Sequence, residues 1–143
     1  MQLPTNLFLD GIQEKKVYYF SNNDLNTAIP HSYICLKRTP DDLLVLSCCT
    51  SKFETIRKFV ETRNLPYETL VWLEADDIIF TKDTYINCNQ YFEKTVEEFK
   101  DLYENGRIEF RGEISDSHFE QIIYGLIASP LIDEEIKDIL PKL

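Results

Sequence analysis

The chain lacks long hydrophobic runs and has few of the residues that build flexible linkers. No apolar stretch approaches the roughly 20 residues that a membrane-spanning helix needs, and only 4 glycines and 6 prolines occur among 143 residues. The first ten residues have neither the basic start nor the long apolar segment of a signal peptide. We therefore expect a single soluble domain over residues 1–143, located in the cytoplasm and without membrane contact.

Patterns typical of metal sites are also missing. The four cysteines include no Cys-x-x-Cys pair, and the neighbours Cys48 and Cys49 would point to opposite faces of a strand. Two histidines are too few for a three-histidine zinc site. The acidic cluster Glu74, Asp76 and Asp77 lacks an ordered ligand spacing and fits a solvated turn better than a cation site. We expect buried, reduced thiols and neither a metal nor another cofactor.

Negative charge is abundant but unevenly distributed. The formal net charge of −10 argues against broad nucleic-acid binding. However, residues 1–60 hold 7 Lys and Arg against 6 Asp and Glu, whereas residues 61–143 hold 8 against 19. A neutral or basic cleft can therefore form from the first 60 residues.

Hydrophobic patterns predict strands and helices that are interspersed along the chain. Strands are expected over 16–20, 32–37, 43–49, 68–73, 84–88 and 107–114, and helices over 53–63, 95–103, 117–127 and 133–140. The first three helices are each introduced by a Ser/Thr-x-x-Glu capping box, which begins at Ser51, Thr95 and Ser117. Because strands and helices do not alternate strictly, the pattern favours an α+β fold, with a mostly antiparallel sheet and helices packed outside it.

Polar side chains lie at one end of the hairpin predicted from strands 32–37 and 43–48. If these strands pair around the turn at 39–42, His31 lies beside Thr50. Ser51 then begins a helix, where free backbone N–H groups favour an anion. Hydroxyl groups bind phosphate oxygens, a lysine balances developing charge, and a histidine moves protons. We therefore predict a catalytic set of His31, Thr50, Ser51 and Lys52.

Structural roles explain the same residues. Ser51 can act only as a helix cap, and Thr50 can simply end a strand. His31 can be a loop residue that is hydrogen-bonded to backbone. Both interpretations stay open from the residues alone.

Three further cations are predicted to bind substrate. Lys37 and Arg38 precede the hairpin turn, and Arg57 lies on the outer face of the helix over 53–63. An ordinary exposed turn pair and a solvated helix face account for these three residues equally well.

The order of motifs resembles the MazF/PemK-like toxin superfamily, with its Kid and ToxN branches. A strand led by Pro30 is followed by an apolar strand that ends in Thr50-Ser51-Lys52. The polar segment 81–85 later opens another strand. A glycine-bearing strand over 111–115 then leads into the helix over 117–127. The resemblance covers most of residues 16–128.

The resemblance implies a small SH3-like barrel, with its core over about 16–128 and a C-terminal helix over 133–140. It implies a homodimeric, metal-independent endoribonuclease of a toxin–antitoxin system, in which the RNA 2′-hydroxyl attacks and a cyclic phosphate remains. Expected partners are single-stranded RNA and an antitoxin, either protein or RNA. By the same resemblance, residues 50–52 form the active-site turn after the third strand, and His31 lies near a basic residue that many members carry before the second.

A competing function is that of a non-catalytic SH3-like barrel acting as a protein-binding or regulatory module. The acidic residues 61–143 motivate it, since an acidic surface suits a basic protein partner better than RNA.

Overall fold

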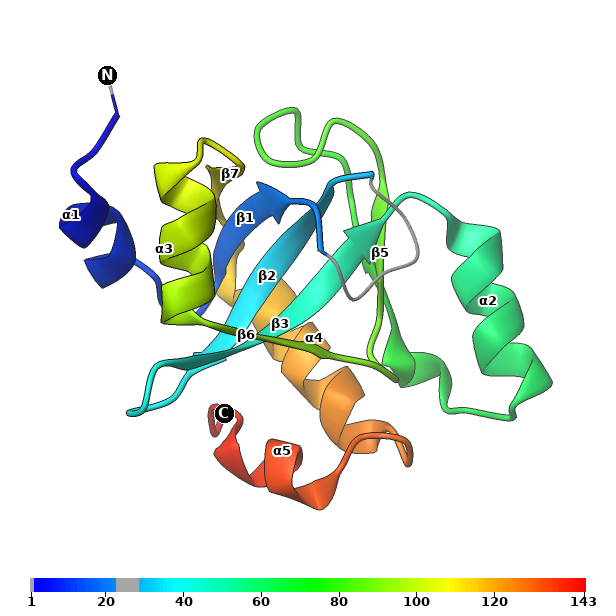
Figure 1. Ribbon diagram of the computed structural model, residues 1–143. Coiled ribbons are helices and arrows are strands. Elements are labelled where there is room, and N and C mark those ends of the chain that lie inside the picture. The colour runs from blue at the N-terminus through cyan, green and yellow to red at the C-terminus, as the bar shows by residue number, and fades with distance from the viewer. Residues whose placement is uncertain (1, 23–28) are drawn as a thin grey trace.

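The computed structural model describes residues 2–22 and 29–143, and the strands within them lie close to the predicted ranges (Figure 1). They are β1 Lys16–Phe20, β2 His31–Arg38, β3 Leu43–Thr50, β4 Leu70–Leu73, β5 Thr84–Asn87, β6 Phe92–Thr95 and β7 Ile108–Glu113. Strand β6 was not predicted. Its four residues, Phe-Glu-Lys-Thr, include two charged side chains and run directly into α3, so they show no strand pattern.

All the strand pairs are antiparallel, and the order in the sheet is β4-β5-β3-β2-β1-β7. Strand β3 pairs with two strands along the same edge: its first half pairs with β6, and its last two residues pair with β5. The α+β prediction with an antiparallel sheet is confirmed. The described sheet is open, with β4 and β7 at its two ends, so the closed barrel stays a prediction.

Five α-helices accompany the sheet within the described residues: α1 Thr5–Asp10, α2 Phe53–Thr62, α3 Val96–Glu104, α4 Asp116–Ala128 and α5 Glu134–Ile139. A short 3₁₀ helix, η1, spans Tyr67–Thr69. Helix α1 was not predicted, because six residues are too few to show helical periodicity. None of the described helices is long and apolar enough to cross a bilayer.

Two of the three predicted capping boxes concern α3 and α4. The box at Thr95 is confirmed, because Glu98 N–H donates to Thr95 Oγ1 and Thr95 N–H donates to Glu98 Oε1, both at 3.0 Å. The box at Ser117 is wrong. Ser115 caps α4 instead, since its hydroxyl accepts the His118 N–H at 3.1 Å, and Ser117 lies inside the first turn. Because serine occurs at both 115 and 117, the sequence did not show which of the two caps the helix.

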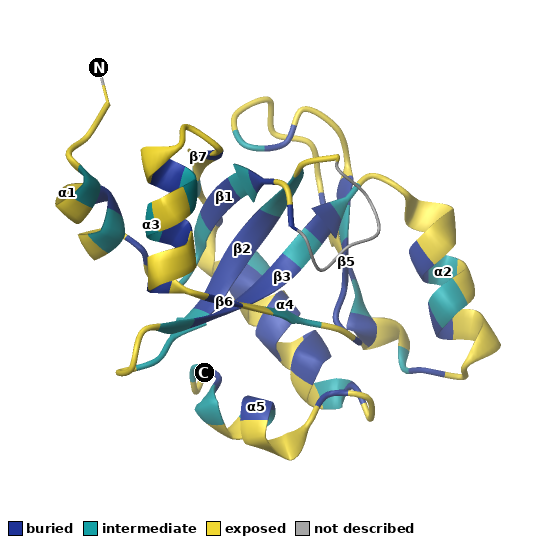
Figure 2. Ribbon diagram, viewed as in Figure 1, coloured by how far each residue is buried: buried dark blue, intermediate teal, exposed yellow. Residues whose placement is uncertain are grey.

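Both faces of the sheet are buried, as the dark blue strands of Figure 2 show. Residues along β2 alternate between two hydrophobic clusters. Tyr33 and Cys35 pack with residues of α1 and α3, whereas Ile34 and Leu36 pack with residues of α4 and α5. A third, smaller cluster joins α2 to β4 and β5. The sheet is thus fixed between helices on both faces, and the ends of its strands are left to form a site.

The predicted hairpin is confirmed, and three of the four cysteines are buried as predicted, whereas Cys48 is half-buried. Strands β2 and β3 pair with Tyr33 opposite Cys48 and Ile34 opposite Ser47. All four thiols are free, and Cys48 and Cys49 face different clusters. Burial raises the pKa of the Cys48 thiol to about 11 and that of Cys35 to about 12. These thiols therefore stay protonated near neutral pH and are poor nucleophiles.

Helix α4 crosses η1 at a glycine. A Cβ added at Gly125 would lie 2.6 Å from the Glu68 carbonyl oxygen and 2.9 Å from the Cys88 sulfur. Only the absence of a side chain allows this close approach, so the contact between α4 and η1 requires glycine at position 125.

Candidate functional site

An open groove of about 630 Å³ lies where the ends of several strands meet. Its walls come from the end of β1, the start of β2, the end of β3, the loop before β5 and one residue of β7. The loop of residues 74–83 rises above the sheet on this side of the molecule (Figure 1). The groove collects all four residues of the predicted catalytic set: His31, Thr50, Ser51 and Lys52.

His31 is held by a local backbone contact. Its Nδ1 lies 3.0 Å from the Ile29 carbonyl oxygen, which can only accept, so Nδ1 carries the hydrogen. In the neutral ring, Nε2 then keeps its lone pair and can act as a base. The predicted bond to backbone is therefore confirmed, although His31 is the first residue of β2 and not a loop residue, and this bond prepares the ring for proton transfer as well.

Thr50 has its hydroxyl oriented by the turn that follows β3. The Lys52 backbone N–H donates to Thr50 Oγ1 at 3.1 Å. Because the oxygen of Thr50 already accepts this bond, the hydroxyl hydrogen is available to an external acceptor such as a phosphate oxygen. The side chain is half-buried at the end of the strand.

Ser51 does not cap α2, so the prediction of a capping box there is wrong. Lys52, one residue after Ser51, is the N-cap residue of α2, and no side-chain hydrogen bond caps the helix. Glu54, which should reach back, instead accepts from Arg57 at 2.6 and 3.1 Å. The strong Glu54–Arg57 pair outcompetes the capping bond. The exposed Ser51 hydroxyl has no hydrogen bond to any described residue and is free to bind a ligand.

Two cations in the groove were missed as site residues. Lys82 comes from the loop before β5, and Arg111 comes from β7. Neither Lys52 nor Lys82 forms an ion pair with a described residue. Arg111 lies over the Tyr19 ring, 4.2 Å from its centroid, and contacts Glu109 at 3.0 Å. Lys82 belongs to the polar segment that opens the strand at 84, which was the only sequence signal for it.

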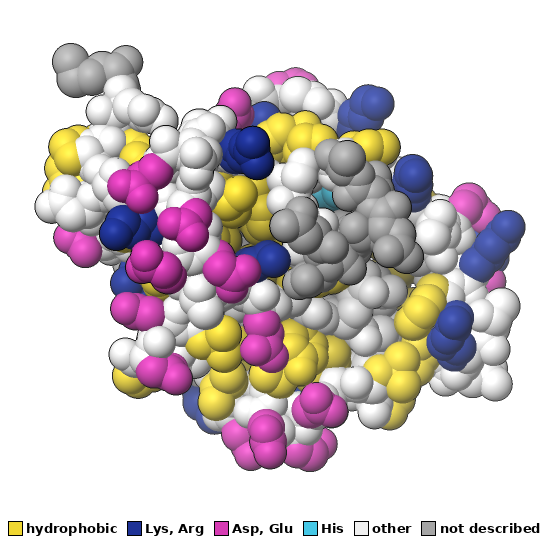
Figure 3. Space-filling view, viewed as in Figure 1, with side chains coloured by type: hydrophobic (Ala, Val, Ile, Leu, Met, Phe, Trp, Pro, Cys, Tyr) yellow, Lys and Arg dark blue, Asp and Glu magenta, His cyan; other side chains and the backbone are white. Residues whose placement is uncertain are grey.

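The groove is positive in an acidic chain. Its described lining contains Lys52, Lys82, Arg111 and a histidine, and no Asp or Glu. In Figure 3, acidic side chains gather instead over α1 and α3 and near α5. The residues that give the groove its charge come from both the neutral and the acidic parts of the sequence. The lining therefore suits an anionic ligand.

The loop that carries Lys82 is rigidly braced by two carboxylates. Asp76 accepts the N–H groups of Ile78, Ile79 and Phe80 at 2.9 to 3.1 Å. Burial opposes ionisation of Asp76, but these bonds outweigh it and lower its pKa. Asp83 accepts the Ala75 N–H at 2.9 Å. The acidic cluster is thus a structural turn, as its spacing suggested, and it fixes one wall of the groove.

The three cations predicted to bind substrate are not in the groove. Arg38 donates to the carbonyl oxygens of Leu9 and Ile12 at 2.7 and 3.1 Å and pairs with Asp42. Arg57 is occupied by carboxylates of its own helix, and Lys37 lies near the far end of β2. The structure therefore assigns Arg38 to holding α1 and Arg57 to bracing α2.

The described residues contain no cluster of three or more His, Cys, Asp and Glu side chains that could hold a metal ion. The arrangement in the groove offers proton transfer, hydroxyl donors and positive charge from the protein's own side chains. A scan against protein-family models finds no match to the chain, and no curated protein matches it either.

Proposed function

We propose that the protein is a metal-independent endoribonuclease that cleaves single-stranded RNA in the groove through attack of the RNA 2′-hydroxyl. The observation that carries the proposal is the meeting of His31 with Thr50, Ser51 and unpaired lysines in one groove. The absence of carboxylates from the described lining favours a polyanion over a cationic or neutral ligand.

Each side chain has a role that follows from its geometry. Nε2 of His31 takes the proton from the 2′-hydroxyl, because Nδ1 is the donor to Ile29. The Thr50 and Ser51 hydroxyls donate to oxygens of the scissile phosphate. Lys52 and Lys82 stabilise the additional negative charge that builds up as the 2′-oxygen attacks. As the bond from phosphorus to the 5′-oxygen breaks, the proton that His31 accepted passes to that oxygen, directly or through water, so the products are a 2′,3′-cyclic phosphate and a 5′-hydroxyl end.

The same proposal includes the wider biological setting. The chain is proposed to be a divergent member of the MazF/PemK-like toxin superfamily, with a sheet derived from a small SH3-like barrel. An antitoxin of protein or RNA, a homodimeric state and a cytoplasmic location belong to this proposal. The antiparallel sheet flanked by helices and the hairpin ending in Thr50-Ser51-Lys52 support it.

Incubation with mixed RNA in EDTA tests the activity. We expect cleavage that survives chelation and leaves cyclic-phosphate ends. Products that depend on added metal, or no products with RNA that is bound in the groove, would overturn the proposal. The same assay with DNA of equal sequence should give no cleavage, because DNA lacks the attacking hydroxyl.

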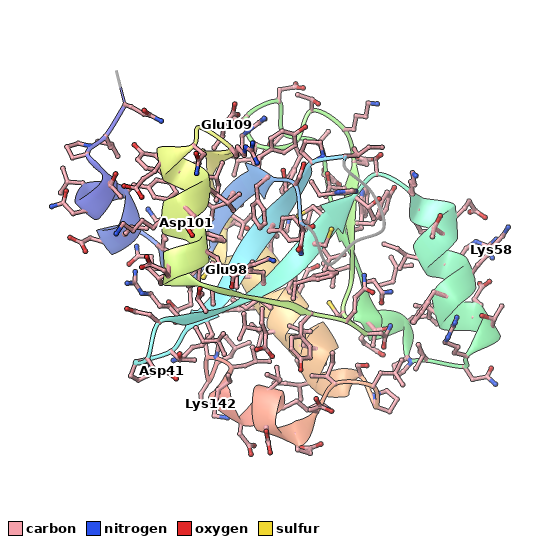
Figure 4. All side chains as sticks on the ribbon, in the orientation of Figure 1. Asp41, Lys58, Glu98, Asp101, Glu109 and Lys142 are labelled. Atoms are coloured by element: carbon pink, nitrogen blue, oxygen red, sulfur yellow. The ribbon has the colours of Figure 1, made fainter. Side chains whose placement is uncertain are left out.

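A non-catalytic binding module is the second candidate, favoured by the acidic surface of α3. Glu97, Glu98, Asp101 and Glu104 lie on this helix, and Figure 4 shows Glu98 and Asp101 projecting from it. Such a surface fits a basic protein. A pull-down in which charge reversal on α3 abolishes binding of a basic partner, together with inert RNA, would favour this function.

A further inference from the structure

We infer that an aromatic row beside the groove, formed by Phe53, Tyr85 and Trp72, binds nucleobases of the single-stranded RNA whose backbone occupies the groove. The inference rests on the proposed function, because it assigns a second part of the same substrate. It adds a stacking site to the phosphate site.

The row follows from the register of three adjacent strands. Thr50 on β3 lies opposite Tyr85 on β5, and Tyr85 lies opposite Trp72 on β4. Residues directly opposite each other in antiparallel strands project from the same face of the sheet. With strands about 5 Å apart, the row runs roughly 10 Å from Thr50 in the groove to Trp72 at the edge of the sheet.

The residues next to this row project from the opposite face of the sheet and belong to the core. One residue along each strand, Cys49, Ile86 and Val71 are also directly opposite each other, and all three are buried in the core. On the aromatic row, by contrast, Trp72 is 49% exposed. Its indole makes no ring contact with a described residue, so core packing does not account for its size.

The third aromatic residue, Phe53, is the first residue of α2 and contacts Tyr85. Phe53, 37% exposed, follows Lys52 in sequence, and its ring centroid lies 5.0 Å from that of Tyr85. The aromatic row therefore begins directly beside Lys52, a cation of the groove. A positive groove that tracks a phosphate backbone, flanked by aromatic rings on which bases stack, is the general arrangement for binding single-stranded nucleic acid.

The only tryptophan of the chain is Trp72, so intrinsic fluorescence reports on the row directly. The experiment uses the full chain carrying His31→Ala, which keeps RNA uncut. We expect saturable quenching by a short oligoribonucleotide. An abasic oligomer of equal length and charge should compete for the groove without quenching. Inorganic polyphosphate should compete in the same way.

Affinity measurements with variants complete the test. Trp72→Ala should weaken binding of the oligoribonucleotide about five- to tenfold and leave the abasic oligomer unchanged, whereas Trp72→Phe should retain most of the affinity. Tyr124→Ala removes a 66% exposed aromatic from α4 and should change neither. Thermal unfolding checks that each variant is folded.

The possible failures are distinguishable. If the wild-type chain cleaves RNA and Trp72→Ala binds it as tightly as wild type, the aromatic row is not a base site and the proposed function stands. If base-bearing and abasic oligomers quench equally, the row senses backbone only and the inference is overturned. If neither oligomer binds, both the inference and the proposed function fall.

Discussion

Two lysines of the groove, Lys52 and Lys82, and an arginine of α2, Arg57, are held in opposite ways. Arg57 on α2 is saturated by Glu54 and Glu61, which lie one turn away on each side. Lys52 and Lys82 in the groove have no such carboxylate among the described residues. Arg57 is therefore paired within its own helix, whereas two of the three cations in the described lining of the groove have no carboxylate partner among the described residues. The unpaired charge of Lys52 and Lys82, together with the absence of Asp and Glu from the described lining, marks the candidate site.

The largest expected effect concerns proton transfer in the groove. His31→Ala should lower the rate of RNA cleavage about 10² to 10⁴-fold, because the base that accepts the 2′-hydroxyl proton is lost. The free energy of unfolding should change by less than about 0.5 kcal/mol, since the ring makes only an exposed local bond to Ile29. Cleavage by the variant at the wild-type rate would remove His31 from the mechanism.

The next effect concerns the close contact between α4 and η1. Gly125→Ala should lower the free energy of unfolding by about 1 to 3 kcal/mol, because its Cβ would collide with the Glu68 carbonyl and the Cys88 sulfur. Denaturant titration measures this. Gly11→Ala is the matched control, since a Cβ there has ordinary contacts at 3.6 Å and should cost little. An unchanged midpoint for Gly125→Ala would show that α4 and η1 separate easily.

A smaller effect tests whether the unpaired lysines of the groove contact phosphate groups of RNA. Lys52→Gln and Lys82→Gln should each reduce the slope of log affinity for single-stranded RNA against log salt by about 0.7, as one phosphate contact is lost. Lys58→Gln on α2 is the control, because Lys58 points away from the sheet (Figure 4). A slope that depends on Lys58 as strongly as on Lys82 would place the RNA across α2.

The smallest effect compares two hydroxyl residues that precede helices. Thr95→Ala should cost about 1 kcal/mol of stability, because Thr95 closes a complete capping box on α3. Ser51→Ala should cost less than about 0.5 kcal/mol, because Ser51 makes no capping bond, and should instead slow RNA cleavage. Equal loss of stability in both variants would restore Ser51 to a purely structural role.

Local patterns predicted most of the fold. The hairpin of β2 and β3 could be predicted because both strands are continuous apolar runs around a proline-containing turn. Helix α1 could not, since it is too short to show a period, and strand β6 could not, since it includes two charged side chains and runs directly into α3; both depend on contacts with distant residues. The first residue of α2 was predicted correctly, but its N-cap residue was not, because Glu54 pairs with Arg57 and does not close a capping box with Ser51.

The candidate site was predictable only where it is local. His31 and Thr50 could be placed together because one hairpin carries both. Lys82 and Arg111 enter the groove through pairings of β5 with β3 and of β7 with β1, which no local pattern indicates. Arg38 was overvalued because a sequence does not show that carbonyl oxygens and a carboxylate already bind its guanidinium group. Lys37 was overvalued because it lies near the end of β2 that is far from the groove.

The pairing of β1 with β7 has a consequence for how the protein is made. This ladder joins residues 16–20 to residues 108–113, so Tyr19 meets Arg111 only after most of the chain exists. Contacts so distant in sequence form late and slow the folding of a domain. During synthesis the N-terminal strands emerge first, and β1 cannot complete its pairing until β7 has been made. A nascent chain that ends before β7 therefore has no complete groove, and the site is assembled only after β7 has been made.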